Sequence, residues 1–195
     1  MHRPTQDQKV ADIEVICGPM FSGKTEELVS RLERLMYADL NFLSFCHEDD
    51  SRYDKEEIVS HNGKSIDTTP VEDVKEIESA VKKFQQENDE LVAVGIDEFQ
   101  FFGEEIVDLA VRLFENERVR VILAGLDRDY KNDAFPGVPQ LLRQAHYVHK
   151  LQAVCQKCGC NASYSQRLSG ETDQIIPGDE EKYEARCYEH FSPSE

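Results

Sequence analysis

The sequence predicts an α/β fold, a P-loop parallel sheet flanked by helices, followed by a small C-terminal module. Short apolar runs alternate with amphipathic segments up to about residue 148, and a glycine-rich loop joins the first run to the first amphipathic segment. The periodicity then weakens, and four of the six cysteines fall within residues 155–195. We therefore expect a disordered N-terminus over residues 1–11, an α/β domain over 12–148 and a second module over 149–195.

The expected elements follow the apolar pattern along the chain. Three largely apolar runs predict buried strands, namely residues 12–17, 91–96 and 119–124, and residues 41–46 are a further strand candidate. Three segments carry apolar residues at helical spacing, namely residues 24–37, 71–86 and 104–116. An Asn-Gly pair at residues 62–63 predicts the turn of a hairpin whose strands are 58–60 and 65–66.

The composition is that of a globular protein with a charged surface. Of its 195 residues, 39% are hydrophobic and 31% are charged, and the net charge is −17. Because a protein that binds nucleic acid polymers needs a basic face, this charge argues against such a partner and indicates a solvated acidic surface. Without a membrane-spanning run or a secretory signal, we expect no membrane partner and a cytoplasmic location.

The loop between the first strand and the first helix matches the phosphate-binding pattern G-x-x-x-x-G-K-[ST]. Its residues are Gly18, Pro19, Met20, Phe21, Ser22, Gly23, Lys24 and Thr25. Glycines let backbone N–H groups surround a phosphate at the N-terminus of a helix. Lys24 can reach the outer phosphates of ATP, and the Thr25 hydroxyl can hold Mg²⁺. The alternative is a simple Gly/Ser turn that caps a helix, which the strand–loop–helix context disfavours.

Two carboxylates follow the strand over residues 91–96. Opposite a phosphate-binding loop, an acid at this strand end binds Mg²⁺, and we expect this of Asp97. Glu98 is a candidate general base, because a carboxylate near the phosphates can accept a proton from an attacking hydroxyl. The alternative is that both acids are merely solvated. For the Phe-Gln-Phe-Phe run over residues 99–102, the pattern leaves open whether the aromatics stack on a base or pack in the core.

The C-terminal segment carries two pairs of potential metal ligands, each with two residues between its members. The four ligands are Cys155, Cys158, Cys187 and His190. Three thiolates and an imidazole suit a tetrahedral structural Zn²⁺, and a module of under about 50 residues needs such a cross-link to fold. A redox Cys-x-x-Cys pair is the alternative, but it would not need the second pair. Cys160 either replaces Cys158 or is a free thiol, and we prefer His190 to His149 because of its spacing.

Taken together, these motifs resemble the cellular type II thymidine kinases over about residues 12–191. The likeness rests on the loop with Pro-Met-Phe at residues 19–21, the run 97–102 and the paired cysteines. It also includes Asp-Ser-Arg-Tyr at residues 50–53 and Ser-His-Asn-Gly at residues 60–63. The resemblance implies ATP-dependent phosphorylation of the 5′-hydroxyl of thymidine or deoxyuridine, feedback inhibition by thymidine triphosphate (dTTP), and a homotetramer with a zinc-bearing lasso domain.

The resemblance also implies roles for individual residues. Glu98 would be the catalytic base, and the residues that hold ATP and its Mg²⁺, beyond the loop itself, would be Asp50, Ser51, Arg52, Asp97 and Gln100. Thymidine would lie against Phe101, Tyr130 and Tyr183, under a covering segment formed by Ile175, Ile176, Pro177, Gly178 and Asp179. Where the family has a small residue after the catalytic acid, this chain has Phe99.

Rival interpretations of the same motifs are a P-loop kinase of another small substrate, a P-loop ATPase with a zinc module, and a nucleotide-dependent binding switch. Glu98 separates the kinase from the switch, because a switch does not need a second carboxylate at the transferred phosphate.

Overall fold

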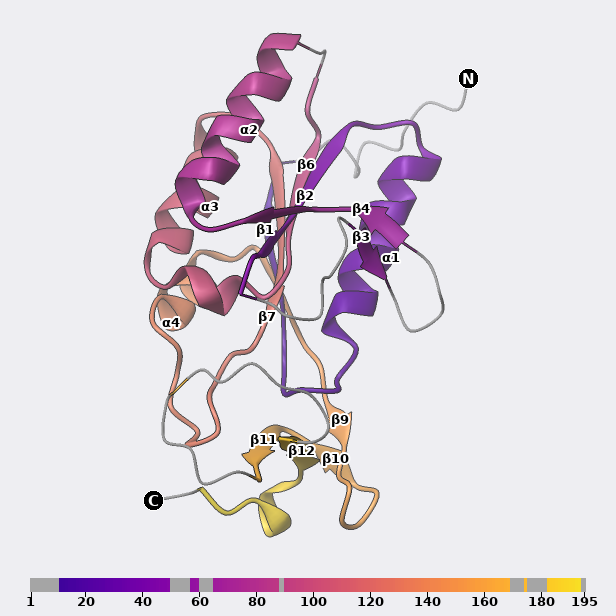
Figure 1. Cartoon of the computed structure of the whole chain (residues 1–195), viewed down its shortest axis with the longest axis vertical. Helices are drawn as coiled ribbons and strands as arrows, with labels where there is room; N and C mark the ends of the chain where they lie inside the picture. Colours follow the sequence, from indigo (N-terminus) through magenta and orange to yellow (C-terminus); the bar gives the residue numbers. More distant parts are fainter. Residues whose placement is uncertain are drawn as a thin grey trace.

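The computed structural model describes residues 11–49, 57–59, 65–87, 90–168, 174 and 182–193. A six-stranded sheet with helices on its two sides forms the upper part of the molecule, and a group of short strands lies below it (Figure 1). The expected disordered N-terminus falls mainly on residues 1–10, which lie outside the described residues.

The large sheet is parallel throughout. Its strands are β1 (Ile13–Cys17), β2 (Phe42–His47), β5 (Thr69–Val71), β6 (Ala93–Ile96), β7 (Arg120–Gly125) and β8 (Tyr147–Lys150). They lie in the order β5-β2-β6-β7-β1-β8, and every pair of neighbours runs in the same direction. The predicted α/β class with a parallel sheet is therefore confirmed.

Helices cover both faces of this sheet (Figure 1). One face packs against α2 (Val74–Glu87), α3 (Glu105–Glu115) and α4 (Val138–Gln144), and the other packs against α1 (Lys24–Tyr37). Side chains alternate along a strand, so Val15 of β1 joins the first core and Ile16 joins the second. Burial on two faces explains why the central strands are continuous apolar runs.

Smaller elements complete the described chain. The hairpin strands are β3 (Glu57–Val59) and β4 (Ser65–Asp67), and they pair antiparallel as expected, with the predicted turn at residues 62–63 outside the described residues. The C-terminal part has two antiparallel pairs, formed by β9 (Ala153–Val154), β10 (Asn161–Ala162), β11 (Tyr164–Arg167) and β12 (Tyr183–Arg186). Two short 3₁₀ helices are η2 (Phe99–Phe102) and η3 (Tyr188–His190).

The start of one helix differs from the sequence-based expectation. The helix predicted from residue 71 begins at Val74, because the Asp73 carboxylate accepts the backbone N–H groups of Lys75 and Glu76 and so caps the helix. Val71 instead ends β5, where it is buried against the core. The domain division expected between residues 148 and 149 stays a prediction; β8 pairs with β1 as far as Lys150.

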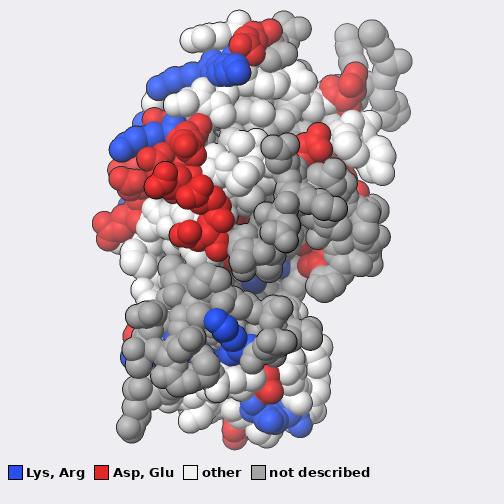
Figure 2. All heavy atoms as spheres, in the orientation of Figure 1, with Lys and Arg blue, Asp and Glu red and all other residues white. Residues whose placement is uncertain are grey.

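The negative charge is concentrated on one side of the visible surface. Figure 2 shows Asp and Glu side chains gathered over the region of α2 and α3. Acidic residues of these two helices include Glu76, Glu78, Glu105 and Asp108. This agrees with a solvated acidic surface. In the part of the chain that the structure describes, no helix has the length and apolar character that crossing a bilayer requires.

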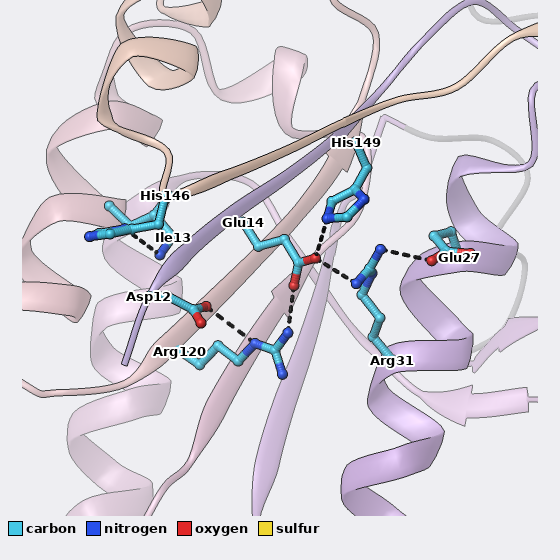
Figure 3. Close-up of polar contacts among 8 residues, drawn as sticks. All are labelled: Asp12, Ile13, Glu14, Glu27, Arg31, Arg120, His146 and His149. Carbon is cyan, nitrogen blue, oxygen red and sulfur yellow. Dashed lines mark hydrogen bonds and ion pairs between the residues drawn. The ribbon is translucent and has the colours of Figure 1, made fainter. Parts of the chain in front are cut away.

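A buried ion cluster lies on the α1 side of β1 (Figure 3). Glu14 of β1 is 1% exposed, and its carboxylate lies 2.5 Å from Arg31 Nη1 and 2.6 Å from Arg120 Nη2. His149 Nε2 approaches the same carboxylate at 2.9 Å, so three elements, α1, β7 and β8, meet at one acid. Arg120 Nε also lies 3.2 Å from Asp12. A charged residue is thus tolerated inside an apolar strand because it is surrounded by cations.

Replacing Glu14 by Gln should destabilise the fold by about 3 kcal/mol, because removing one partner of a buried ion pair leaves the other charges uncompensated. Urea unfolding followed by circular dichroism measures the change. The matched control is Glu27→Gln, which removes an Arg31 partner whose side chain is 44% exposed and should cost less than about 1 kcal/mol. Equal losses for the two variants would contradict a special role for the buried acid.

Candidate active site and metal cluster

The glycine-rich loop connects β1 to the N-terminus of α1, as the motif predicts. Gly18, Phe21 and Gly23 have φ angles of 153°, 63° and 82°, so the chain turns sharply before the helix begins at Lys24. No side chain caps this helix end, which leaves its N–H groups oriented for an anion. Lys24 Nζ and Ser22 Oγ both donate to the Pro19 carbonyl, at 2.9 Å and 2.8 Å, which holds the lysine across the loop.

Gly18 is needed where the loop begins. A Cβ at this position would lie 2.6 Å from the Leu151 carbonyl oxygen, and the φ of 153° lies in a region that side chains rarely adopt. The Leu151 N–H donates to the Cys17 carbonyl at 2.8 Å. The phosphate loop is therefore packed directly against the segment that leaves β8 toward the C-terminal strands.

The two residues expected to hold Mg²⁺ lie together. Thr25 Oγ1 donates to Asp97 Oδ2 at 2.9 Å, although the two residues are 72 positions apart. Asp97 is fully buried after β6, and its other oxygen accepts the N–H of Glu98 at 3.0 Å. A hydroxyl and a carboxylate beside a phosphate loop are oxygen ligands of the kind that Mg²⁺ uses, so these residues fit the ion.

Glu98 has a strained backbone. Its φ and ψ are 50° and 44°, in the left-handed region where a residue other than glycine costs about 1–3 kcal/mol. Gln100 Nε2 donates to Glu98 Oε2 at 2.5 Å, while Gln100 Oε1 accepts the N–H of Leu126 at 2.9 Å. The Gln100 amide thus orients the candidate base and is itself held by the backbone just after β7. Gly125 makes room for this bridge, since a Cβ there would lie 2.4 Å from Gln100 Oε1.

The aromatic run after Glu98 has two environments. Phe99 and Phe102 are buried in the hydrophobic core on the α2–α4 face of the sheet. Phe99 also fills the space beside Gly125. Phe101 is only half-buried, and its ring stacks on His47 with centroids 5.3 Å apart. Core packing therefore accounts for Phe99 and Phe102, and Phe101 keeps surface for a ligand.

Two of the residues predicted to contact thymidine are brought together by a residue that the sequence did not indicate. Arg167 lies over the Tyr130 ring, 3.6 Å from its centroid, and its Nη2 donates to the Tyr183 hydroxyl at 2.8 Å. Gln174 joins this group through Asp129, whose Oδ2 accepts its amide at 3.0 Å. An arginine in a short alternating strand carries no sequence signal of its own, so only the fold reveals this contact.

Several predicted site residues lie outside the described residues. They are the expected ATP contacts Asp50, Ser51 and Arg52, and the expected covering segment Ile175, Ile176, Pro177, Gly178 and Asp179.

The four predicted metal ligands form one cluster. Their ligand atoms all lie within 4.8 Å of one another, with Cys158 Sγ 3.7 Å from Cys187 Sγ and His190 Nδ1 3.2 Å from Cys187 Sγ. Tetrahedral zinc bonded to sulfur at about 2.3 Å sets its ligands about 3.8 Å apart, so the donor set and its spacing fit zinc. His149 is bound to Glu14 instead. Cys160 is not one of the four clustered ligands: its carbonyl accepts the Cys155 N–H at 2.8 Å, and its thiol lies beside that of Cys158.

The cysteines differ in their readiness to form thiolates. Desolvation opposes the charged form of Cys155, but hydrogen bonds from the backbone of Cys187, Lys157 and Cys158 outweigh it and lower the thiol pKa to about 6. In contrast, burial and then the negative charge of Asp127 raise the pKa of Cys17 to about 11. Cys17, beneath the phosphate loop, is therefore a neutral core residue at physiological pH.

Fold and site together define a P-loop enzyme of the phosphoryl-transfer class, with a C-terminal Cys/His cluster that fits a metal ion. Comparison with known proteins gives the particular family. The family model described as thymidine kinase matches residues 11–191. The chain is 42% identical over 181 residues to the thymidine kinase of Bdellovibrio bacteriovorus, covering 93% of this chain and 85% of that protein. The chain belongs to the thymidine kinase family and is an ATP-dependent nucleoside kinase.

Purified protein should contain one zinc ion per chain, and Cys158→Ser should lose it while Cys160→Ser keeps it. The reason is that Cys158 Sγ belongs to the four-ligand cluster and the Cys160 thiol does not. Elemental analysis after dialysis measures the zinc content. Zinc loss in Cys160→Ser with retention in Cys158→Ser would reverse the ligand assignment.

Proposed function

We propose that the chain transfers the γ-phosphate of ATP to the 5′-hydroxyl of thymidine, and to that of deoxyuridine. The observation that carries this proposal is the meeting of the phosphate loop, the Thr25–Asp97 pair and Glu98 at one edge of the sheet. This is the edge where parallel strands end and where α/β proteins bind their ligands. Membership of the thymidine kinase family supports the choice of nucleoside.

In the proposed reaction, Glu98 accepts the proton of the 5′-hydroxyl as its oxygen attacks the γ-phosphorus. The new P–O bond forms as the bond from that phosphorus to the β,γ-bridging oxygen breaks, which gives thymidine monophosphate and ADP. Lys24 and the loop N–H groups hold the phosphates and offset their charge. Thr25 and Asp97 would hold Mg²⁺, which neutralises charge on the phosphate oxygens when bound.

The Glu98 carboxylate is suited to its task by its position. Gln100 fixes one of its oxygens, and the left-handed backbone turns the residue out of the line of β6. A base held in this way needs little reorganisation before it takes the proton. The remaining contacts are proposed from the family likeness. Asp50, Ser51 and Arg52 would contact ATP, and Phe101, Tyr130 and Tyr183 would contact the nucleoside. Residues 175–179 would cover the base.

We extend the proposal to regulation and assembly on the same likeness. Thymidine triphosphate carries both the base of one substrate and the phosphate chain of the other, so it suits a feedback inhibitor that bridges the two halves of the site. A homotetramer, a cytoplasmic location and a structural role for zinc are proposed with it. The module that carries the zinc is proposed to begin after Lys150, where the chain leaves the large sheet.

The zinc-loaded protein should form radiolabelled thymidine monophosphate from thymidine and γ-labelled ATP, and should phosphorylate deoxyuridine as well. Thin-layer separation of the products after incubation with each natural nucleoside measures this preference. Release of labelled phosphate without labelled nucleotide would favour an ATPase. Transfer to another nucleoside alone would assign a different substrate.

Glu98→Gln should lower kcat by about 10²–10⁴-fold while thymidine and ATP still bind, because the amide keeps the shape of the side chain but cannot accept a proton. Steady-state kinetics and isothermal titration calorimetry measure the two effects. Glu105→Gln is the matched control, since Glu105 is an exposed acid on the nearby helix α3. A near-normal kcat in Glu98→Gln would place the base elsewhere.

A further inference from the structure

Strand β11 contacts the α/β domain through two buried side chains. Ser165 and Arg167 are 3% and 4% exposed, and they lie on the same face of the strand because side chains alternate. Ser165 Oγ accepts the N–H of Met20, in the phosphate loop, at 3.0 Å. Arg167 contacts Tyr130, in the loop after β7, two residues further on. One short strand therefore touches both halves of the proposed active site.

The Arg167 guanidinium covers one face of Tyr130. Its central carbon lies 3.6 Å from the ring centroid, which is the distance of a stacked cation–π contact. The Lys131 ammonium also lies over the ring, 5.6 Å from its centroid, and Tyr130 is only 2% exposed. The arginine therefore fixes the plane of the Tyr130 ring.

The same guanidinium sets the hydrogen-bonding role of Tyr183. Arg167 and Tyr183 are paired across β11 and β12, and the Tyr183 hydroxyl accepts Nε at 3.2 Å and Nη2 at 2.8 Å. A phenolic oxygen that accepts from a cation turns its own proton toward other partners. Toward a substrate, Tyr183 is thus a donor, and a sugar oxygen is the acceptor that it suits.

A third contact reaches the chain just before the proposed covering segment. Arg167 Nη2 also donates to the Gln174 carbonyl at 3.2 Å, and the Gln174 side chain donates to Asp129, next to Tyr130. Arg167 is therefore surrounded by three groups that come from separate parts of the sequence. Two of them, Tyr130 and Tyr183, are themselves proposed to bind the nucleoside, and Gln174 directly precedes Ile175.

We propose that Arg167 is a positioning residue of the nucleoside pocket, which fixes the ring of Tyr130 and makes the Tyr183 hydroxyl a donor toward the sugar. This inference rests on the proposed function, because it takes the ligand of the two tyrosines to be the nucleoside. Arg167 would thus determine how thymidine binds without affecting how ATP binds.

The test is the kinetic effect of Arg167→Gln and Arg167→Lys on the two substrates. Arg167→Gln should raise the KM for thymidine about tenfold or more and change the KM for ATP less than about twofold, because the cation and the paired N–H groups are lost only at the nucleoside side. Arg167→Lys keeps the positive charge but loses the planar guanidinium group. Its KM for thymidine should therefore lie between those of the wild type and Arg167→Gln.

The matched control is Arg186→Gln. Arg186 is a buried arginine of the neighbouring strand β12, but it pairs with Glu184 and not with the tyrosines. Zinc content should stay at one ion per chain in all variants, which checks that the module has folded. A similar rise in the KM for thymidine in Arg186→Gln, or equal changes in both KM values in Arg167→Gln, would assign Arg167 a structural role and overturn the proposal.

A double-mutant cycle with Tyr183→Phe supplies a second measurement. If Arg167 acts through the Tyr183 hydroxyl, Arg167→Gln should raise the KM for thymidine less in the Tyr183→Phe background than in the wild type. Additive effects would overturn the assigned link. The wild-type assay distinguishes failure of this proposal from failure of the proposed function. Absence of thymidine phosphorylation by the wild-type protein would reject the proposed function itself.

Discussion

The order of three neighbouring strands, β6-β7-β1, is the constraint on which the rest of the structure depends. Because these strands are parallel, their carboxyl ends lie at one edge of the sheet, and each strand is followed there by a different segment of the site. The phosphate loop follows β1, the carboxylates Asp97 and Glu98 follow β6, and the turn that carries Tyr130 follows β7. The 2.9 Å contact between Thr25 and Asp97 is the direct result of this arrangement.

Local sequence patterns predict most of the α/β domain. The first helix runs from Lys24 to Tyr37, as its apolar spacing indicates, and the central strands coincide with the apolar runs within two residues. The start of α2 could not be placed by periodicity, because Val71 is apolar both at a helical position and in β5. Its role there depends on pairing with β2, a tertiary contact.

The site was predictable where its chemistry is local. A phosphate loop and paired Cys/His ligands have fixed spacings, so their residues could be named from the sequence. Contacts between distant residues carry no such spacing. Arg120 meets Glu14 across 106 residues, and Arg167 meets Tyr130 only because β11 folds back onto the large domain. In each case a charged side chain is buried by partners that only the assembled fold supplies.

The left-handed backbone at Glu98 places steric strain at the residue proposed as the catalytic base. Glycine adopts this conformation without steric cost, so Glu98→Gly would relieve strain at the same position where it deletes the carboxylate. Selection for thermal stability alone would therefore favour loss of the acid.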